Sequence, residues 1–333
     1  MKVIKAFGFH DLRIIDVPIP SVKPNEVLVK VKACGICGSD KWCWETKEPA
    51  EHIAGHEVAG EVVDVGDNVK SIKNGDAVAI NNVKGCGVCE ACIQGNYVSC
   101  QEDIIHMSHG FSEYVAVPER NCLILSKNIS YEEGSLIFDN WGTPYNAVER
   151  AHIKKNDYVV ICGCGPIGIA AIRLSKLKEA KVIAIDPVAF RRDFAVSMGA
   201  DLVLDPYSAS LNKTIKDLTN GKGVCVFIEC SGKEQSYHLA FDILKKGGKL
   251  ISVGEGVHLT LNLSDDIIHK QISMIGSFYS TMEQGEYVQQ LLLDGLIDPI
   301  KLVTHRFTFE ELPKKFGEIF NNSEGILKTI LIP

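Results

Sequence analysis

Four cysteines lie in the sixteen-residue segment "GCGVCEACIQGNYVSC", residues 85–100. Two residues separate the first cysteine from the second and the second from the third, and seven residues separate the third from the fourth. This spacing allows four thiolates of one loop to surround Zn²⁺ as a tetrahedron without an open position. The loop has little apolar content of its own, and zinc binding worth about 10–16 kcal/mol orders small zinc domains of this kind. The pattern therefore predicts a structural zinc site formed by Cys86, Cys89, Cys92 and Cys100.

A second set of possible metal ligands is dispersed along the chain. Cys37 lies in "CGICGSD", His56 and Glu57 lie in "AGHEVAGEV", and Asp139 lies in "LIFDNWGT". A thiolate, an imidazole and a carboxylate from separate segments suit a catalytic zinc that keeps one position for water or substrate. Taken singly, the signal is poor, because a lone histidine in a glycine-rich stretch is more often a structural residue and a lone cysteine is usually a core residue.

The segment "DYVVICGCGPIGIAAIRL" (157–174) has the pattern of a phosphate-binding turn between a strand and a helix. Gly163, Gly165 and Gly168 form G-x-G-x-x-G, and Pro166 and Ile167 fall where the helix begins. These glycines would allow a tight turn, a close approach of the backbone to a pyrophosphate, and close packing of helix on strand. The helix N-terminus would offer unpaired N–H groups to the phosphates.

An acidic residue follows at the expected distance. Asp186 lies 23 residues after Gly163, at the end of the run "VIAID". Its carboxylate can accept hydrogen bonds from both ribose hydroxyls of NAD and would repel a 2′-phosphate, so NAD is predicted in preference to NADP. The nearby Arg191 and Arg192 would partly offset this repulsion. The alternative is a solvated aspartate that closes a strand before Pro187.

The distribution of short apolar runs predicts an α/β protein of two parts. Residues up to about 140 show β-branched, alternating runs typical of an antiparallel β domain, among them 26–33, 57–66, 76–80 and 111–117. Six further runs, most of them separated by helical stretches, predict a doubly wound parallel sheet. Helices are expected at 283–295 and 310–322, and a last strand at 326–333.

Composition limits the classes of function. The 333 residues are 46% apolar and 23% charged, with a net charge of −7 and no basic run, which argues against a nucleic-acid-binding protein. The longest apolar run is too short for a membrane span and the N-terminus lacks a signal peptide, so a cytoplasmic protein is expected. The scattered cysteines are predicted to be core residues, namely Cys122, Cys162, Cys164, Cys225 and Cys230.

Taken together and in this order, the motifs resemble the zinc-dependent medium-chain dehydrogenase/reductase family of alcohol, sorbitol and threonine dehydrogenases. The resemblance covers nearly the whole chain. It implies a GroES-like catalytic domain formed by residues 1–140 and 281–333, which carries the zinc loop 85–100, and a Rossmann NAD-binding domain at 141–280. It also implies two zinc ions per chain, one catalytic and one structural.

The resemblance assigns roles to individual residues. Cys37 and His56 match the first two catalytic-zinc ligands, whereas the third corresponds to Asp139 in some relatives and to Glu57 in others. Asp40 matches the carboxylate that orients the histidine, and Ser39 matches the hydroxyl that takes the substrate proton. Thr143 would pack on the far face of the nicotinamide.

The sequence departs from the alcohol dehydrogenase pattern at one position. Trp42 stands where a histidine often ends the proton relay, so the proton must leave through waters, ribose hydroxyls or another group such as His52. Trp42 and Trp141 are predicted to line the substrate pocket, because aromatic faces stack on sugars. Trp44 is expected to pack under the following loop.

The predicted function is a zinc-dependent NAD oxidoreductase that interconverts a small secondary alcohol, expected to be a polyol or sugar-derived hydroxyl, and its ketone. Carboxylate ligands and a polar site favour a substrate that chelates zinc through two hydroxyls. The alternatives are a zinc-free enone or quinone reductase of the same superfamily and a non-catalytic zinc module. The apolar run 272–280 resembles the family's subunit-pairing edge and predicts a homodimer or homotetramer.

Overall fold

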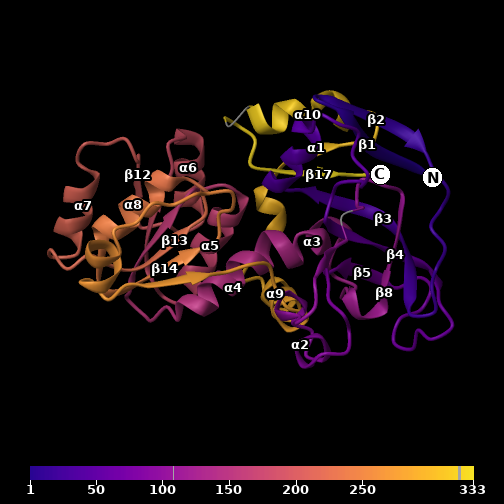
Figure 1. Cartoon of the computed structure of the whole chain (residues 1–333), viewed down its shortest axis with the longest axis horizontal. Coiled ribbons are helices and arrows are strands. Elements are labelled where there is room, and N and C mark those ends of the chain that lie inside the picture. Colours follow the sequence, from indigo (N-terminus) through magenta and orange to yellow (C-terminus); the bar gives the residue numbers. More distant parts are fainter. Residues whose placement is uncertain (108, 322–323) are drawn as a thin grey trace. The chain divides into compact units, whose positions relative to one another are not determined.

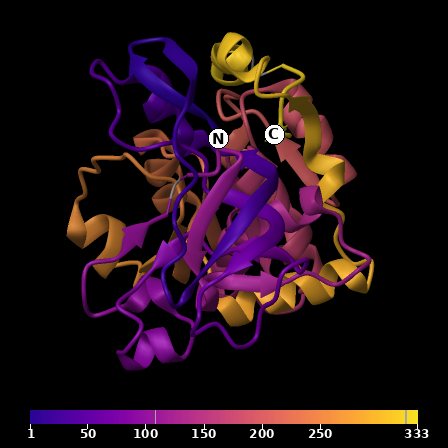
Figure 2. The same cartoon turned by 90° about the vertical axis from the view of Figure 1, so that its right-hand side faces the viewer.

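The computed structural model describes residues 1–107, 109–321 and 324–333, and the chain divides into two compact units. Unit 1 consists of Met1–Gly142 and Ser280–Pro333, and unit 2 consists of Thr143–Tyr279. Both chain ends belong to unit 1 (Figure 1, Figure 2). The last strand returns to the N-terminal segment because it pairs antiparallel with a strand of that segment, with Thr329 opposite Ile36.

Unit 1 is built on a sheet in which β16, β17, β3, β4, β5 and β9 follow one another, with β8 also paired to β3. Two smaller sheets pair β1 with β2 and β6 with β7. The strands are β1 (Lys2–Gly8), β2 (Asp11–Asp16), β3 (Glu26–Ile36), β4 (Glu57–Val65), β5 (Ala77–Ile80), β6 (Val83–Lys84), β7 (Ile105–His106), β8 (Tyr114–Pro118), β9 (Cys122–Ile124), β16 (Val303–Phe307) and β17 (Lys328–Leu331).

The helices of unit 1 are short, apart from two near the C-terminus. They are η1 (Gly38–Asp40), α1 (Lys41–Glu45), α2 (Glu90–Ile93), η2 (Tyr97–Ser99), η3 (Glu119–Asn121), α3 (Tyr131–Ser135), the π-helix η4 (Ile137–Trp141), α9 (Met282–Leu293), η6 (Pro299–Leu302) and α10 (Leu312–Asn321). The predicted helices at 283–295 and 310–322 correspond to α9 and α10, and residue 322 lies outside the described residues. Figure 1 shows α10 beside α1 and β2.

An aromatic cluster fixes α10 on the N-terminal part of unit 1. The ring of Phe316 is fully buried and lies 5.9 Å from the ring of Trp44 and 6.0 Å from that of Phe111, measured between centroids. Trp44 also stacks on His10 at 4.6 Å. Trp44 is therefore a packing residue, and buried aromatic area of this size contributes strongly to the stability of a core.

Unit 2 is a parallel sheet with the strand order β12-β11-β10-β13-β14-β15, and each strand is parallel to its neighbours. This is the order of a Rossmann domain, so the predicted fold class is confirmed. The elements are α4 (Gly142–Ala151), which begins at the boundary, β10 (Tyr158–Cys162), α5 (Pro166–Leu177), β11 (Lys181–Ile185), α6 (Ala189–Ser197), β12 (Leu202–Leu204), α7 (Leu211–Leu218), β13 (Val224–Glu229), α8 (Glu234–Ile243), β14 (Leu244–Ser252), η5 (Leu263–Ile268) and β15 (Ser273–Gly276).

The central strands of unit 2 are buried along their length. In β10, Val159, Val160 and Ile161 have no exposed surface, although successive side chains of a strand point to opposite faces. A strand that is apolar on both faces requires a layer of helices on each side. Leu211 in α7 and Phe241 in α8 belong to the core cluster on one of those faces.

The scattered cysteines only partly match the prediction that they are core residues. Cys122, Cys162 and Cys164 are buried, whereas Cys225 and Cys230 are half-buried. Cys225 lies close enough to the surface for the ammonium of Lys245 to donate to its sulfur over 3.1 Å.

In the described ranges of the chain, no helix is both long and apolar enough to cross a membrane. The cytoplasmic location expected from the sequence stays a prediction.

Candidate functional site

The dispersed candidate ligands meet at the ends of two neighbouring strands of unit 1. Cys37 follows β3 directly, and His56 and Glu57 stand at the start of β4, which pairs with β3. Asp139 is carried by the π-helix η4, a rare helix form that is often found at functional sites. One ligand atom from each of the four residues lies within 4.8 Å of all the others.

Asp40 connects the segment of Cys37 to the segment of His56. Its carboxylate accepts hydrogen bonds from the backbone N–H of Cys37 at 2.8 Å and of Gly55 at 3.2 Å. Its Oδ1 lies 3.4 Å from Nδ1 of His56. With Nδ1 facing Asp40, the other ring nitrogen, Nε2, faces Asp139 Oδ2 at 2.9 Å. Asp40 therefore orients the imidazole as the carboxylate partner of a metal-binding histidine does.

The electrostatics of this cluster fit a cation. Burial, followed by the nearby charge of Asp139, raises the pKa of Cys37. Burial alone would lower the pKa of His56, but Asp40 and Asp139 outweigh it and raise that pKa. A divalent cation among these atoms would reverse both effects, because it stabilises the thiolate and the neutral imidazole that ligate metals. The donor set of sulfur, nitrogen and oxygen suits zinc.

Glu57 is shared between the cluster and a lysine. Its Oε1 forms a buried ion pair with Nζ of Lys328, and its Oε2 accepts no hydrogen bond within the described part of the chain. Burial raises the pKa of Glu57, and the ammonium of Lys328 opposes this rise. Burial acts to lower the pKa of Lys328, but the nearby acidic groups, first among them Glu57, together raise that pKa.

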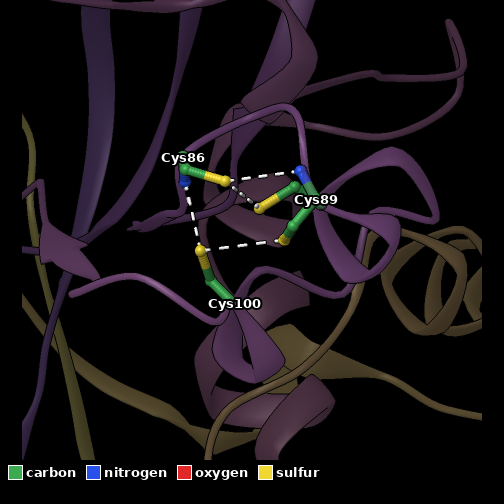
Figure 3. Close-up of side chains that lie close together, drawn as sticks. Cys86, Cys89 and Cys100 are labelled. Carbon is green, nitrogen blue, oxygen red and sulfur yellow. Dashed lines mark hydrogen bonds between the residues drawn. The ribbon is translucent and has the colours of Figure 1, made fainter.

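The four cysteines of the loop also converge, and Figure 3 shows Cys86, Cys89 and Cys100 with their sulfurs close together. The sulfurs of Cys86 and Cys92 lie 4.0 Å apart, and those of Cys89 and Cys100 lie 3.9 Å apart. Gly85 makes room for them, because a Cβ at this position would lie 2.4 Å from the sulfur of Cys92. Four sulfurs at these separations can surround one ion and leave no position open, as in a structural zinc site.

Backbone N–H groups around the sulfurs favour thiolates. Those of Gln101 and Cys92 lower the pKa of Cys89 to about 6, and those of Val88 and Cys89 lower the pKa of Cys86. Burial instead raises the pKa of Cys92 to about 12. Two of the thiols therefore ionise readily, whereas the buried thiol of Cys92 does not. A metal ion bound to the sulfurs would stabilise its thiolate form.

In unit 2, two glycines of the predicted phosphate-binding turn are required by its geometry. Gly163 has a φ of 92°, and a Cβ there would lie 2.8 Å from the backbone nitrogen of Ser231. A Cβ on Gly168 would lie 1.8 Å from the carbonyl oxygen of Gly163. Gly165 is the N-cap of α5, and Pro166 and Ile167 begin that helix. Space beside Gly165 is open, since a Cβ there would meet no atom of the described chain within 4 Å.

Asp186 lies at the end of β11 and is nearly fully buried. Its Oδ2 accepts from the backbone N–H of Cys164 at 2.8 Å, and its Oδ1 accepts from that of Val188 at 2.8 Å. It therefore joins the phosphate-binding turn to the next loop. The guanidinium of Arg192 donates to the carbonyl oxygens of Asp186 and Pro187, at 2.8 and 2.9 Å. Nε of Arg191 is buried and has no hydrogen-bond partner in the described ranges.

The remaining predicted residues differ in their environments. Ser39 and Trp42 are exposed, and Thr143 is buried in the first turn of α4. Trp141 is fully buried, so its ring offers no surface to a solute and does not fit the predicted role in lining a pocket. The sequence places this tryptophan beside Asp139 but gives no signal that the π-helix turns its ring into the core.

Lys328 is the residue that sequence reasoning missed. It lies in the segment "ILKTILIP", where a single lysine among apolar residues is the only available signal. Its partner is 271 positions away in the chain. Only the pairing of β17 with β3 brings the two together.

Comparison with known proteins agrees with this geometry. Residues 23–127 match the family described as alcohol dehydrogenase GroES-like domain, and residues 166–294 match the family described as zinc-binding dehydrogenase. An L-threonine 3-dehydrogenase of Caldanaerobacter subterraneus subsp. tengcongensis is 33% identical over 345 residues, covering 99% of this chain and 98% of that protein. An L-galactonate-5-dehydrogenase of Escherichia coli is 30% identical over 326 residues, covering 95% and 94%.

A solved structure gives the same result for the fold. Galactitol-1-phosphate dehydrogenase from Escherichia coli superposes with a TM-score of 0.89 at 28% identity and covers 100% of both chains. The chain belongs to the zinc-dependent medium-chain dehydrogenase family. It is therefore an oxidoreductase of the alcohol and polyol dehydrogenase type, linked to a nicotinamide cofactor.

The cysteine loop leads to a first prediction. Cys100→Ser removes one of four thiolates, so the loop is expected to lose its zinc, and the metal content measured by mass spectrometry should fall by one ion per chain. Residues 85–100 should then be cut faster by a protease, because the metal replaces a core in this loop. Cys225→Ser, at a half-buried cysteine of unit 2, is the control. An unchanged metal content in the Cys100 variant would contradict the assignment.

Proposed function

We propose that this protein is a zinc- and NAD-dependent dehydrogenase that oxidises a polar secondary alcohol to its ketone. The observation that carries the proposal is the convergence of Cys37, His56, Glu57 and Asp139 within 4.8 Å, next to a carboxylate that orients the histidine. A zinc ion held there would supply a Lewis acid that lowers the pKa of a hydroxyl, as it lowers that of water from about 16 to about 7. The nicotinamide supplies the hydride acceptor.

The residues of the chain supply the positioning and the first proton acceptor. Asp40 keeps the imidazole of His56 oriented and holds the turn that carries Cys37. Ser39 lies between Cys37 and Asp40 in the sequence, on an exposed turn. Its hydroxyl can take the substrate proton and pass it to water. Trp42, which is also exposed, cannot relay a proton itself, so we propose that the proton passes from Ser39 to water.

NAD is proposed as the cofactor because of the residues around Asp186. A buried carboxylate at the end of β11 keeps lone pairs for the ribose hydroxyls after it has accepted two backbone hydrogen bonds. The same charge repels a 2′-phosphate. Arg192, one of the two neighbouring arginines that could neutralise such a phosphate, already donates to two carbonyl oxygens and lies 3.6 Å from Asp205.

Asp186→Asn tests the cofactor preference. The variant removes the charge, so the ratio of NADH to NADPH affinity is expected to shrink about tenfold, which corresponds to about 1.4 kcal/mol of lost discrimination. Fluorescence titration of both cofactors gives the ratio. Asp193→Asn, at an exposed position in α6, should leave the ratio unchanged. Equal binding of NADH and NADPH by the unmodified protein would refute the proposal.

The relatives direct the search for a substrate. Their names describe dehydrogenases of a hydroxy amino acid, a sugar acid and a sugar-alcohol phosphate. All three substrates carry a second polar group beside the reacting hydroxyl. We propose that the substrate of this protein is likewise a polyol or sugar-derived alcohol, with L-threonine as the second candidate.

A screen of NADH formation tests both candidates. Sugar alcohols, aldonates, their phosphates and L-threonine should include at least one substrate. Cys37→Ser should abolish the activity and reduce the zinc content from two ions to one. Cys43→Ser, in the same stretch, should keep both ions, because the sulfur of Cys43 only donates to the carbonyl oxygen of Asp40 at 2.9 Å. Full activity of the Cys37 variant would contradict the proposed site.

We also propose a homodimer or homotetramer. β15 is the last strand in the order of the unit 2 sheet, and its Met274 and the following Phe278 are 44% and 40% exposed. An unpaired edge with exposed apolar side chains favours pairing with a second copy. Sedimentation of the holoenzyme should give a dimer or tetramer, and Met274→Lys should weaken the assembly. A monomer at micromolar concentration would refute it.

A further inference from the structure

Glu229 carries a fully buried carboxylate at the end of β13. Its Oε1 accepts hydrogen bonds from the backbone N–H of Ser231 at 2.7 Å and from the hydroxyl groups of Ser231 and Ser236. The N–H of Gly232 is shared by Oε1 and Oε2, at 3.1 and 3.2 Å. Among the described residues, no lysine, arginine or histidine forms an ion pair with this carboxylate. Glutamates are almost never fully buried unless they are paired, so Glu229 is an exception.

Glu229 lies where the order of the strands in unit 2 reverses. β11 and β12 lie on one side of β10, and β13, β14 and β15 lie on the other. Glu229 stands directly opposite Cys162, the last residue of β10, in the parallel pairing of the two strands. The segment after Glu229 is packed against the predicted phosphate-binding turn, because a Cβ on Gly163 would lie 2.8 Å from the backbone nitrogen of Ser231. Dinucleotides bind at such a reversal, in the crevice outside the carboxyl ends of the strands.

The two halves of a dinucleotide lie on opposite sides of this reversal. Asp186, the proposed partner of the adenosine ribose, follows β11 on one side. The nicotinamide half is therefore expected on the other side, where β13 and β14 end. Glu229 also fixes the end of β14, because its carbonyl oxygen accepts from the N–H groups of Val253 and Gly254, both at 3.0 Å. The buried carboxylate thus belongs to the half of the crevice that is expected to hold the nicotinamide.

The negative charge of Glu229 acts on the groups around this half of the crevice. Burial, followed by the charge of Glu229, raises the pKa of Cys162 and of Cys230, which stand at the ends of β10 and β13. The hydrogen-bond donors and the start of α8, which carries Ser236, stabilise the carboxylate without cancelling its charge. A nicotinamide ring carries a positive charge in NAD⁺ and none in NADH. A negative charge on this side therefore interacts differently with the two forms of the cofactor.

We propose that Glu229 is a specificity-determining residue for the redox state of the cofactor, whose charge favours the binding of NAD⁺ relative to NADH. The inference rests on the NAD-dependent dehydrogenase of the proposed function. In alcohol oxidation NAD⁺ enters and NADH leaves, so a carboxylate that favours the oxidised form eases the exchange of product for the next cofactor. Product release limits the turnover of many enzymes. Asp186 has a different role, because its proposed contacts to the ribose are the same for both forms.

Glu229→Gln tests the proposal, because glutamine keeps the shape of the side chain and removes its charge. Calorimetric titrations of the holoenzyme with NAD⁺ and with NADH, at one pH and one salt concentration, give the ratio of their dissociation constants. The variant is expected to lose at least about fivefold in affinity for NAD⁺ relative to NADH, the order expected for one partly screened charge. Asp186→Asn should weaken the binding of both forms and keep the ratio. An unchanged ratio in the Glu229→Gln variant would overturn the inference, because a merely structural role would weaken both forms alike.

A second variant keeps the test decisive if Glu229→Gln does not fold. Ser231→Ala combined with Ser236→Ala removes two hydroxyl donors but keeps the carboxylate, so its charge is less well compensated. The double variant should bind NAD⁺ more tightly, relative to NADH, than the unmodified protein does. A ratio that stays the same or shifts toward NADH would overturn the inference. Failure of the proposed function gives a different result, because the unmodified protein would then bind neither NAD⁺ nor NADH.

Discussion

A concentration of buried charge governs the architecture of unit 1. The thiol of Cys37, the imidazole of His56 and the carboxylates of Glu57 and Asp139 occupy one small volume, and Asp40 lies directly behind the imidazole. Such groups are costly to remove from water unless cations balance them. The buried ammonium of Lys328 meets part of this requirement through its ion pair with Glu57, and a zinc ion at the proposed site would meet the rest.

The strands around this volume bring the buried charges and the compensating cation together. β3 ends just before Cys37 and β4 begins at Glu57, and β17 brings Lys328 from the other end of the chain. The aromatic packing of Phe316 on Trp44 and Phe111 holds the C-terminal segment that carries this strand. Removal of β17 would therefore leave the buried carboxylate of Glu57 without its ammonium partner.

In unit 2 the constraint is different, because backbone segments must approach each other closely at the turn between β10 and α5. Gly163 and Gly168 contact each other so closely that a single methyl group would not fit between them. The buried carboxylate of Asp186 then fixes the turn from the side through the N–H of Cys164. A rigid turn with free N–H groups at the start of a helix is suited to a pyrophosphate.

The sequence by itself determined the features that depend on local spacing. The four cysteines of the loop, the glycines before α5 and the alternation of apolar runs act over a few residues, so the fold class and the ligand candidates could be predicted from them. Spacing could not show that Glu57 and Asp139 lie in one cluster, or that Glu57 forms a buried ion pair with Lys328. Nor could it show that Trp141 is buried while Trp42 is exposed. These properties arise from contacts between residues far apart in the chain, and only the tertiary structure decides which charge lies beside which.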